Sequence, residues 1–236
     1  MNAVRAILFD KDGTLVDFDR TWGPATYAVM RRLAEGDEAA FDRLQQASHY
    51  DLDARRLLPT SPLLAGSSAE YGPLWADALG RASTASFLGE IDRLFVEEGM
   101  RFLTPIGTPA ATLARLHRTG LTLGIATNDA VHNARLQVES LGLSPLLDAI
   151  YGYDSGHGAK PAPGMVLAFC ARTGLPPDAV ALVGDTHHDL LTAKAAGVRA
   201  VMVRSGPATV DGFAQDADLV VDDVAALADL LLGSAA

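Results

Sequence analysis

Six short, nearly continuous apolar runs most strongly constrain how this chain folds. They are residues 4–9, 121–126, 149–151, 179–183, 198–203 and 219–221. Apolar runs of this length without polar alternation are typical of strands that are buried on both faces of a parallel sheet. Most of the segments between them carry apolar residues at helical spacing. This alternation predicts an α/β fold built on a parallel sheet.

Proline and glycine mark where the helices between these runs begin and end. Pro109 and Pro163 favour helix starts, and Gly174 and Gly197 favour helix ends, because glycine readily adopts the left-handed backbone found there. The predicted helices span residues 108–120, 130–141 and 163–174, and a further one ends at Gly197.

The segment between the first and second apolar runs is far longer than the usual strand-to-helix connection of about 2 to 6 residues. Its apolar residues recur at helical spacing, and Ser67 and Glu70 have the spacing of a capping box. Residues 57–68, rich in Pro, Ser and Gly, predict a loop. We expect residues 17–99 to form an inserted helical domain, and residues 1–16 and 100–236 to form the core around the sheet.

Composition and charge argue against several classes of function. The 236 residues include 19 basic and 29 acidic side chains, a formal charge of −10, which repels nucleic acids and anionic membrane surfaces. No apolar stretch approaches the roughly 20 residues of a membrane span, and the apolar N-terminal stretch is too short for a signal peptide. The single cysteine cannot form an internal disulfide. We expect a cytoplasmic protein that binds neither nucleic acid nor membranes.

Polar residues follow several of the apolar runs, at the strand ends where reactive groups collect in a parallel sheet. These residues are Asp10, Asp12, Gly13, Thr127, Asn128, Lys160, Asp185 and Asp189. Each short motif on its own is common in turns and helix caps. Lys160, however, is one of only three lysines in the chain. The order of the motifs, each after its own strand, predicts one active site at the carboxyl edge of the sheet.

The acidic residues at this edge favour a bound cation. Asp10, Asp12, Asp185 and Asp189 would repel one another strongly in one crevice, and hard oxygen ligands suit Mg²⁺ rather than Zn²⁺. With Mg²⁺ and Lys160 offsetting the carboxylates, a phosphate dianion can approach despite the net charge. The carboxylate of Asp10 can then attack phosphorus in line.

These motifs resemble those of the haloacid dehalogenase (HAD) superfamily. Its members carry DxDGT, then a Thr or Ser after the second strand, then a Lys and a GDxxxD motif, in the order found here. The resemblance covers about residues 1–16 and 100–232, and among subgroups it is closest to the phosphoglycolate phosphatase-like hydrolases. It implies a Rossmann-like (HAD-like) parallel-sheet core and identifies the helical insert with the family's cap domain.

The resemblance also implies a role for each motif residue. Asp10 would be the nucleophile that forms an aspartyl-phosphate, and Asp12 would protonate the leaving oxygen and later accept a proton from water. Phosphate binding would involve Gly13, Thr127, Asn128 and Lys160. The metal ligands would be the side chains of Asp10 and Asp185, the backbone carbonyl of Asp12, and Asp189 as a further ligand or an orienting residue.

Two neighbours of these motifs are expected to have structural roles. Lys11 should face away from the site, because consecutive residues in an extended segment face opposite sides. Asp129 should cap the following helix.

The motifs therefore predict a Mg²⁺-dependent phosphatase acting on a small phosphorylated metabolite such as phosphoglycolate. One alternative is a phosphomutase or phosphotransferase of the same superfamily, which would use the same Asp10 and pass the phosphoryl group to a sugar. Another is a non-enzymatic phospho-acceptor signalling module, which also combines a strand-end Asp with Thr, Lys and Mg²⁺. The base-like Asp12, the position of Asp10 after the first strand and the large insert favour hydrolysis over signalling.

Overall fold

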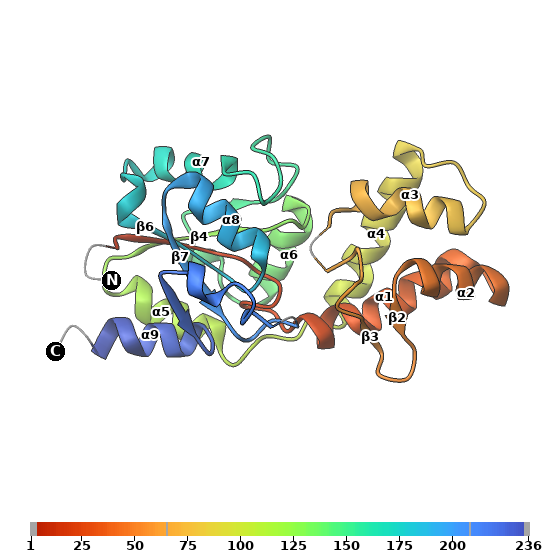
Figure 1. Cartoon of the computed structure of the whole chain (residues 1–236), viewed down its shortest axis with the longest axis horizontal. Coiled ribbons are helices and arrows are strands. Elements are labelled where there is room, and N and C mark those ends of the chain that lie inside the picture. The colour runs from red at the N-terminus through yellow and green to blue at the C-terminus, as the bar shows by residue number, and fades with distance from the viewer. Residues whose placement is uncertain (1–3, 65, 208, 234–236) are drawn as a thin grey trace. The chain divides into compact units, whose positions relative to one another are not determined.

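The computed structural model describes residues 4–64, 66–207 and 209–233, and the chain divides into two compact units (Figure 1). Phe18–Thr104 form one unit, and the flanking chain forms the other. The first unit continues past the boundary predicted at residue 99 because its last helix runs to Arg101. Residues 1–3, 208 and 234–236 of the predicted core, and residue 65 of the predicted loop, lie outside the described residues.

The flanking chain forms a six-stranded parallel sheet in the order β5-β4-β1-β6-β7-β8. The strands are β1 (Ala6–Phe9), β4 (Thr122–Ala126), β5 (Ala149–Tyr151), β6 (Val180–Gly184), β7 (Arg199–Val203) and β8 (Leu219–Val221). Each of the six apolar runs forms a strand, which confirms the predicted α/β class. Strand β1 is central because both β4 and β6 pair with it.

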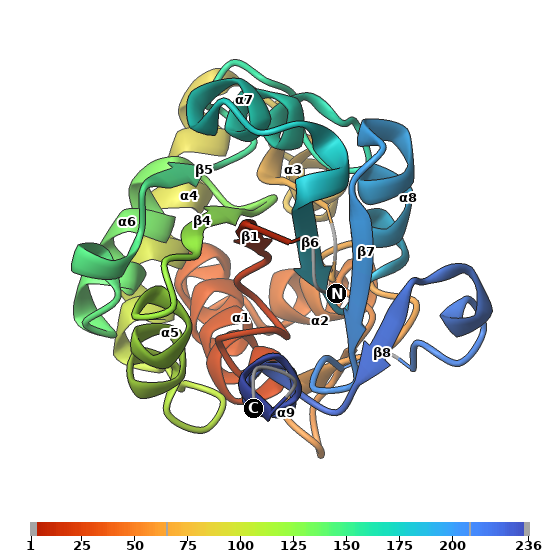
Figure 2. The ribbon, with the colours of Figure 1, turned by 90° about the vertical axis from the view of Figure 1, so that its left-hand side faces the viewer.

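Helices cover both faces of this sheet (Figure 2). One face carries α5 (Pro109–His117), α6 (Val131–Ser140) and α9 (Val224–Gly233), and the other carries α7 (Gly164–Thr173) and α8 (His187–Ala196). Short 3-10 helices occur at η1 (Ser144–Leu146), η2 (Pro177–Ala179) and η3 (Ala214–Asp216). In β1, Ile7 packs on one face and Leu8 on the other, so an unbroken apolar run is what this strand needs.

Three of the helix boundaries predicted from proline and glycine are confirmed. Helix α5 begins with Pro109, and α7 and α8 end at Gly174 and Gly197, whose φ angles of +66° and +71° are left-handed. Within the described residues, no helix combines the length and the apolar character needed to cross a bilayer.

The Phe18–Thr104 unit is helical, as predicted, and has its own apolar core. Its helices are α1 (Phe18–Ala34), α2 (Glu38–Ala47), α3 (Ser68–Ala78) and α4 (Ala85–Arg101). The capping box is present, since the Ser67 amide donates a hydrogen bond to Glu70 Oε2 at 2.7 Å. A small hairpin of β2 (Tyr50–Asp51) and β3 (Arg56–Leu57) was not predicted, because two-residue strands carry no measurable periodicity.

Trp75 anchors the core of this helical unit and gives a test of its packing. Its side chain is fully buried, and its Nε1 donates to Ser48 Oγ at 3.0 Å. We expect Trp75→Ala to lower the free energy of unfolding by about 3–5 kcal/mol, because it leaves a cavity and removes a buried hydrogen bond. Urea unfolding followed by the fluorescence of Trp22, the other tryptophan of the chain, measures the change.

The neighbouring Leu74 provides a matched control on the same helix. It is 48% exposed, so Leu74→Ala should change the free energy of unfolding by no more than about 0.5 kcal/mol. Equal losses in the two variants would contradict the assignment of Trp75 to the core.

Candidate active site

The register of the sheet aligns the carboxyl ends of three neighbouring strands. Phe9 at the end of β1 is level with Ile125 on β4 and Val183 on β6, and the Asp10 amide donates to the Val183 carbonyl at 2.7 Å. The chain passes to β4 and β5 on one side of β1 and to β6, β7 and β8 on the other. Parallel sheets bind ligands in the crevice at such a switch point.

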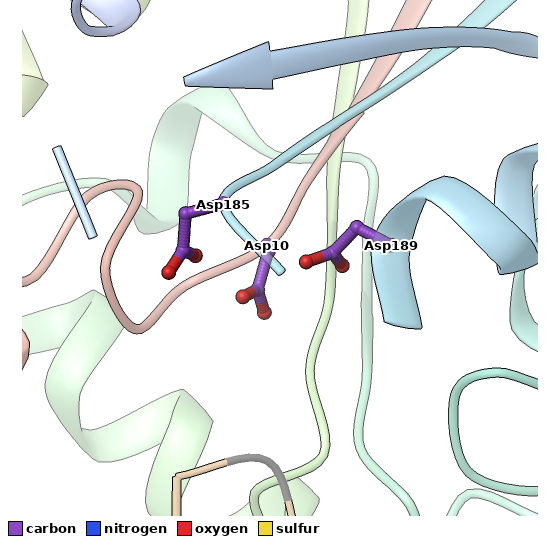
Figure 3. Close-up of side chains that lie close together, drawn as sticks. All are labelled: Asp10, Asp185 and Asp189. Carbon is purple, nitrogen blue, oxygen red and sulfur yellow. The ribbon is translucent and has the colours of Figure 1, made fainter. Parts of the chain in front are cut away.

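Three buried carboxylates meet at this point (Figure 3). Asp10 follows β1, Asp185 follows β6, and Asp189 lies in the first turn of α8. One carboxylate oxygen from each lies within 4.8 Å of the others, and the exposed fractions of the residues are 5%, 1% and 1%. The structure therefore brings together three of the four acidic residues that the sequence assigns to a metal site.

Lys160 supplies a positive charge to this carboxylate cluster. Its Nζ lies 2.7 Å from Asp10 Oδ1 and 2.7 Å from Asp189 Oδ1, and the side chain is buried. The side chain of Asn128 holds the backbone of Lys160 on both sides: Nδ2 donates to the Lys160 carbonyl at 2.9 Å, and Oδ1 accepts from its amide at 2.7 Å. This pair of bonds fixes where the lysine enters the site.

The carboxylates carry more charge than Lys160 balances. Burial raises the pKa of Asp10 from 3.8 to about 7, although Lys160 opposes the change. Burial, with the charges of Asp10 and Asp189, also raises the pKa of Asp185 well above its usual value. Burial alone would lower the pKa of Lys160, but the two neighbouring carboxylates outweigh it and raise that pKa. A hard divalent cation with oxygen ligands fits such an excess of buried negative charge.

Asp185 is held in place by Gly13 and by three residues that the sequence analysis did not assign to the site, Thr14, Ser205 and Gly206. Thr14 Oγ1 donates a hydrogen bond to Asp185 Oδ1 at 3.2 Å. A Cβ at Gly13 or at Gly206 would collide with the Asp185 carboxylate, and Gly13 also has a left-handed φ of +81°. Ser205 Oγ donates to the Gly13 carbonyl at 2.8 Å. Glycine at both positions lets the loops after β1 and β7 come close to this carboxylate. No sequence motif indicates the approach of the loop after β7.

Asp189 is fixed by the start of its own helix. Its Oδ2 accepts hydrogen bonds from the Thr186 amide at 3.0 Å and from Thr186 Oγ1 at 2.6 Å, and its Oδ1 accepts from Lys160. Both oxygens of Asp189 therefore have protein partners. Because Thr186 fixes one oxygen of Asp189 and Lys160 contacts the other, Asp189 is well placed to orient Lys160.

Asp12 lies apart from the buried carboxylates. Among the described residues, the group of acids close enough to share a metal ion consists of Asp10, Asp185 and Asp189. Both carboxylate oxygens of Asp12 lie 2.7 Å from Lys11 Nζ. Asp12 is still near enough to Asp10 for its charge to raise the pKa of Asp10.

Lys11, which the sequence predicts to face away from the site, instead pairs with Asp12, one of the predicted site residues. It is 1% exposed, and its Nζ also contacts Gln137 Oε1 at 2.5 Å and Asp129 Oδ2 at 3.2 Å. The prediction that Asp129 caps the next helix is wrong, because Ala130 is the N-cap of α6. Strand alternation predicts where Cβ points, but a long lysine side chain can turn back. The one sequence signal for a buried role of Lys11 is the rarity of lysine in this chain.

Thr127 completes the set of predicted residues at this edge. It follows β4, is 1% exposed, and its Oγ1 accepts a hydrogen bond from the Asp129 amide at 3.1 Å. Its amide donates to the Tyr151 carbonyl at 3.0 Å, which fixes the loop beside β1. The residues at this edge of the sheet therefore include carboxylates, an ammonium group and a hydroxyl, the groups needed to attack and stabilise a phosphoryl group.

Comparison with known proteins places this site in a family. A sequence model of the haloacid dehalogenase-like hydrolases matches residues 4–197. The chain is 31% identical over 230 residues to a phosphoglycolate phosphatase of Rhodospirillum rubrum, covering 96% of this chain and 90% of the relative. It is 30% identical over 218 residues to a phosphoglycolate phosphatase of Salmonella typhi, covering 86% of this chain and 82% of the relative.

A solved structure shares the fold. A HAD phosphatase from Thermococcus onnurineus superposes with a TM-score of 0.70 at 23% identity, covering 98% of each chain. The family match spans both the carboxylate cluster and the helical insert. On this match and on the relatives, the chain belongs to the haloacid dehalogenase-like hydrolases.

Proposed function

We propose that this chain is a Mg²⁺-dependent phosphatase that hydrolyses a small phosphate monoester through an aspartyl-phosphate on Asp10. The observation that carries the proposal is the meeting of Asp10, Asp185 and Asp189 with Lys160 at the central strand ends. This arrangement provides a carboxylate nucleophile beside positive charge, in a family of hydrolases.

The donor set fits Mg²⁺, since it consists of buried carboxylate oxygens with an excess of negative charge. The side chains of Asp10 and Asp185 and the backbone carbonyl of Asp12 would hold the ion. We assign Asp189 the orienting role, because both of its oxygens already have protein partners. A bound divalent cation would offset the carboxylate charge and polarise a phosphoryl oxygen.

In the first step, a carboxylate oxygen of Asp10 attacks phosphorus and the bond to the leaving oxygen breaks. Asp12, as a carboxylic acid, gives its proton to that oxygen, so an alcohol departs. Lys160, the Thr127 hydroxyl and the backbone amide of Asn128 bind the phosphoryl oxygens, with Gly13 shaping the loop beside them.

In the second step, water attacks phosphorus of the aspartyl-phosphate. The Asp12 carboxylate takes a proton from that water, the bond from phosphorus to the Asp10 oxygen breaks, and inorganic phosphate leaves. Asp10 and Asp12 are then in the protonation states in which they began, so the cycle can repeat.

Phosphoglycolate is our first candidate substrate, because two of the relatives carry the name phosphoglycolate phosphatase. We also propose a cytoplasmic location, which the single cysteine fits. The other substrates to compare are sugar phosphates, nucleotides and pyrophosphate.

Phosphate release from this panel, with Mg²⁺ or EDTA, tests the proposal. We expect Mg²⁺-dependent turnover that Asp10→Asn lowers by about 10⁴-fold or more, because the amide is a far poorer nucleophile. Lys194→Met serves as a control, since Lys194 is exposed and pairs with Asp216 on the surface, and it should keep full activity.

Two outcomes would replace the proposal with an alternative. Phosphate that remains on a sugar acceptor would indicate a phosphomutase or phosphotransferase. A stable phosphoprotein without turnover would indicate a signalling module.

Asn128→Ala tests how Lys160 is positioned. The substitution removes both hydrogen bonds to the Lys160 backbone, so we expect kcat/KM to fall by about 10- to 100-fold through misplacement of the ammonium. Thermal unfolding, measured in parallel, separates this effect from a loss of folded protein. An unchanged kcat/KM would show that Lys160 does not depend on Asn128.

The metal-free protein should lose stability as the pH rises toward neutrality. Burial raises the pKa of Asp10 to about 7 in the folded chain and raises that of Asp185 as well, whereas an unfolded Asp titrates at about 4. The folded state therefore binds more protons than the unfolded state between about pH 4 and pH 7, and its stability falls across this window. Mg²⁺ binds the ionised carboxylates, so it should raise Tm more at about pH 8 than at about pH 5.5.

Two variants make this comparison specific to the site. Asp185→Asn should remove most of the pH dependence of the Mg²⁺ effect, whereas Asp229→Asn, at an exposed carboxylate on α9, should retain it. An equal rise in Tm at both pH values in the unchanged protein would argue against metal binding by these acids.

A further inference from the structure

Lys11 lies at the centre of a second polar cluster, separate from the one around Lys160. The side chain is 1% exposed, and its ammonium contacts both oxygens of Asp12, Asp129 Oδ2 and Gln137 Oε1. Burying a lysine is unfavourable unless its charge is paired and hydrogen-bonded. The cluster meets this requirement, because carboxylate and amide oxygens surround the ammonium.

The partners of Lys11 connect it to helix α6. Gln137 lies on α6 and is fully buried. Asp129 Oδ2 accepts a hydrogen bond from Asn133 Nδ2, also on α6, at 2.8 Å, and Asp129 Oδ1 accepts from the Ala130 amide at 2.7 Å. The ammonium of Lys11 is therefore held by groups that a helix keeps in place.

Asp12, by contrast, lies on a loop. The loop after β1 turns sharply, with the Leu15 and Val16 amides both donating to the Lys11 carbonyl at 2.8 and 2.9 Å. The carboxylate of Asp12 is 17% exposed, and its two oxygens both lie 2.7 Å from Lys11 Nζ. Lys11 thus links a partly exposed carboxylate on a loop to the buried face of α6.

We propose that Lys11 is a positioning residue that fixes the orientation of the Asp12 carboxylate for proton transfer. This inference rests on the proposed phosphatase function. Asp12 gives its proton to the leaving oxygen as the bond from phosphorus to that oxygen breaks, and later takes a proton from the attacking water. Lys11 keeps its own protons in both steps and acts only through the placement of Asp12.

The competing explanation is that Lys11 only neutralises Asp129. Burial raises the pKa of Asp129, and the charge of Lys11 opposes that change. Under this explanation Lys11→Met is harmful only because it leaves a buried acid unpaired. The double variant Lys11→Met, Asp129→Asn removes both charges and separates the two explanations, and it also serves if Lys11→Met alone does not fold.

The test compares leaving groups. A proton donor matters for a phosphate ester of an alkyl alcohol, whose alkoxide leaves poorly, and matters little for 2,4-dinitrophenyl phosphate, whose phenolate leaves without a proton. The measured quantity is the rate of leaving-group release in the first turnover with Mg²⁺, so that the second step does not contribute. The control is Lys194→Met, the same substitution at an exposed lysine on α8.

We expect Lys11→Met, alone and with Asp129→Asn, to slow release of the alkyl alcohol by about 10²-fold and release of the dinitrophenolate by less than about threefold. The double variant should regain Tm without regaining alkyl release. An equal loss with both leaving groups, or full recovery of alkyl release in the double variant, would overturn the positioning role.

The wild-type protein distinguishes failure of the Lys11 proposal from failure of the proposed phosphatase function. A wild-type chain that releases both leaving groups in an Asp10-dependent first turnover, and then releases inorganic phosphate, supports the phosphatase, whatever the Lys11 variants do. A wild-type chain that releases neither would overturn the phosphatase and, with it, the role of Lys11.

Discussion

The pairing of Lys160 with Asp10 and Asp189 is the interaction on which the rest of this site depends. One buried ammonium lies 2.7 Å from each of two carboxylates that come from different parts of the chain. The parallel sheet makes this meeting possible, because β1 and β6 are neighbours and end in register. Asn128 fixes the backbone of Lys160 through two hydrogen bonds, and this places the ammonium group at the strand ends.

A second buried lysine is paired with carboxylates in the same way. Of the three lysines in the chain, Lys160 and Lys11 are buried, and each contacts two aspartates. The first lysine serves the carboxylates that would attack phosphorus and orient the site, and the second holds the acid proposed to move the proton. The charge of Asp185 remains poorly balanced, since burial and its acidic neighbours raise its pKa, and this imbalance is the physical basis for expecting a cation.

Periodicity predicted the strands and the residues that follow them, because a strand buried on both faces must be apolar until it ends. Asp10, Thr127 and Asp185 were therefore identifiable from position alone. The partners that fix them were not. Gly206 approaches Asp185 from the loop after β7, and that approach depends on tertiary packing that no local pattern records. The contact of Lys11 with Asp12 is not predictable for a related reason. Strand alternation indicates where Cβ points and not where the end of a long flexible side chain lies.

The central claim is that Asp10 carries the phosphoryl group during turnover. Rapid acid quenching of the protein with Mg²⁺ and [³²P]acetyl phosphate, followed by peptide mapping, tests it most directly. The account predicts label on the peptide that contains Asp10, with more label in Asp12→Asn, because the second step then lacks its base. Phosphate release with no labelled protein at any time, or label on a different residue, would contradict it.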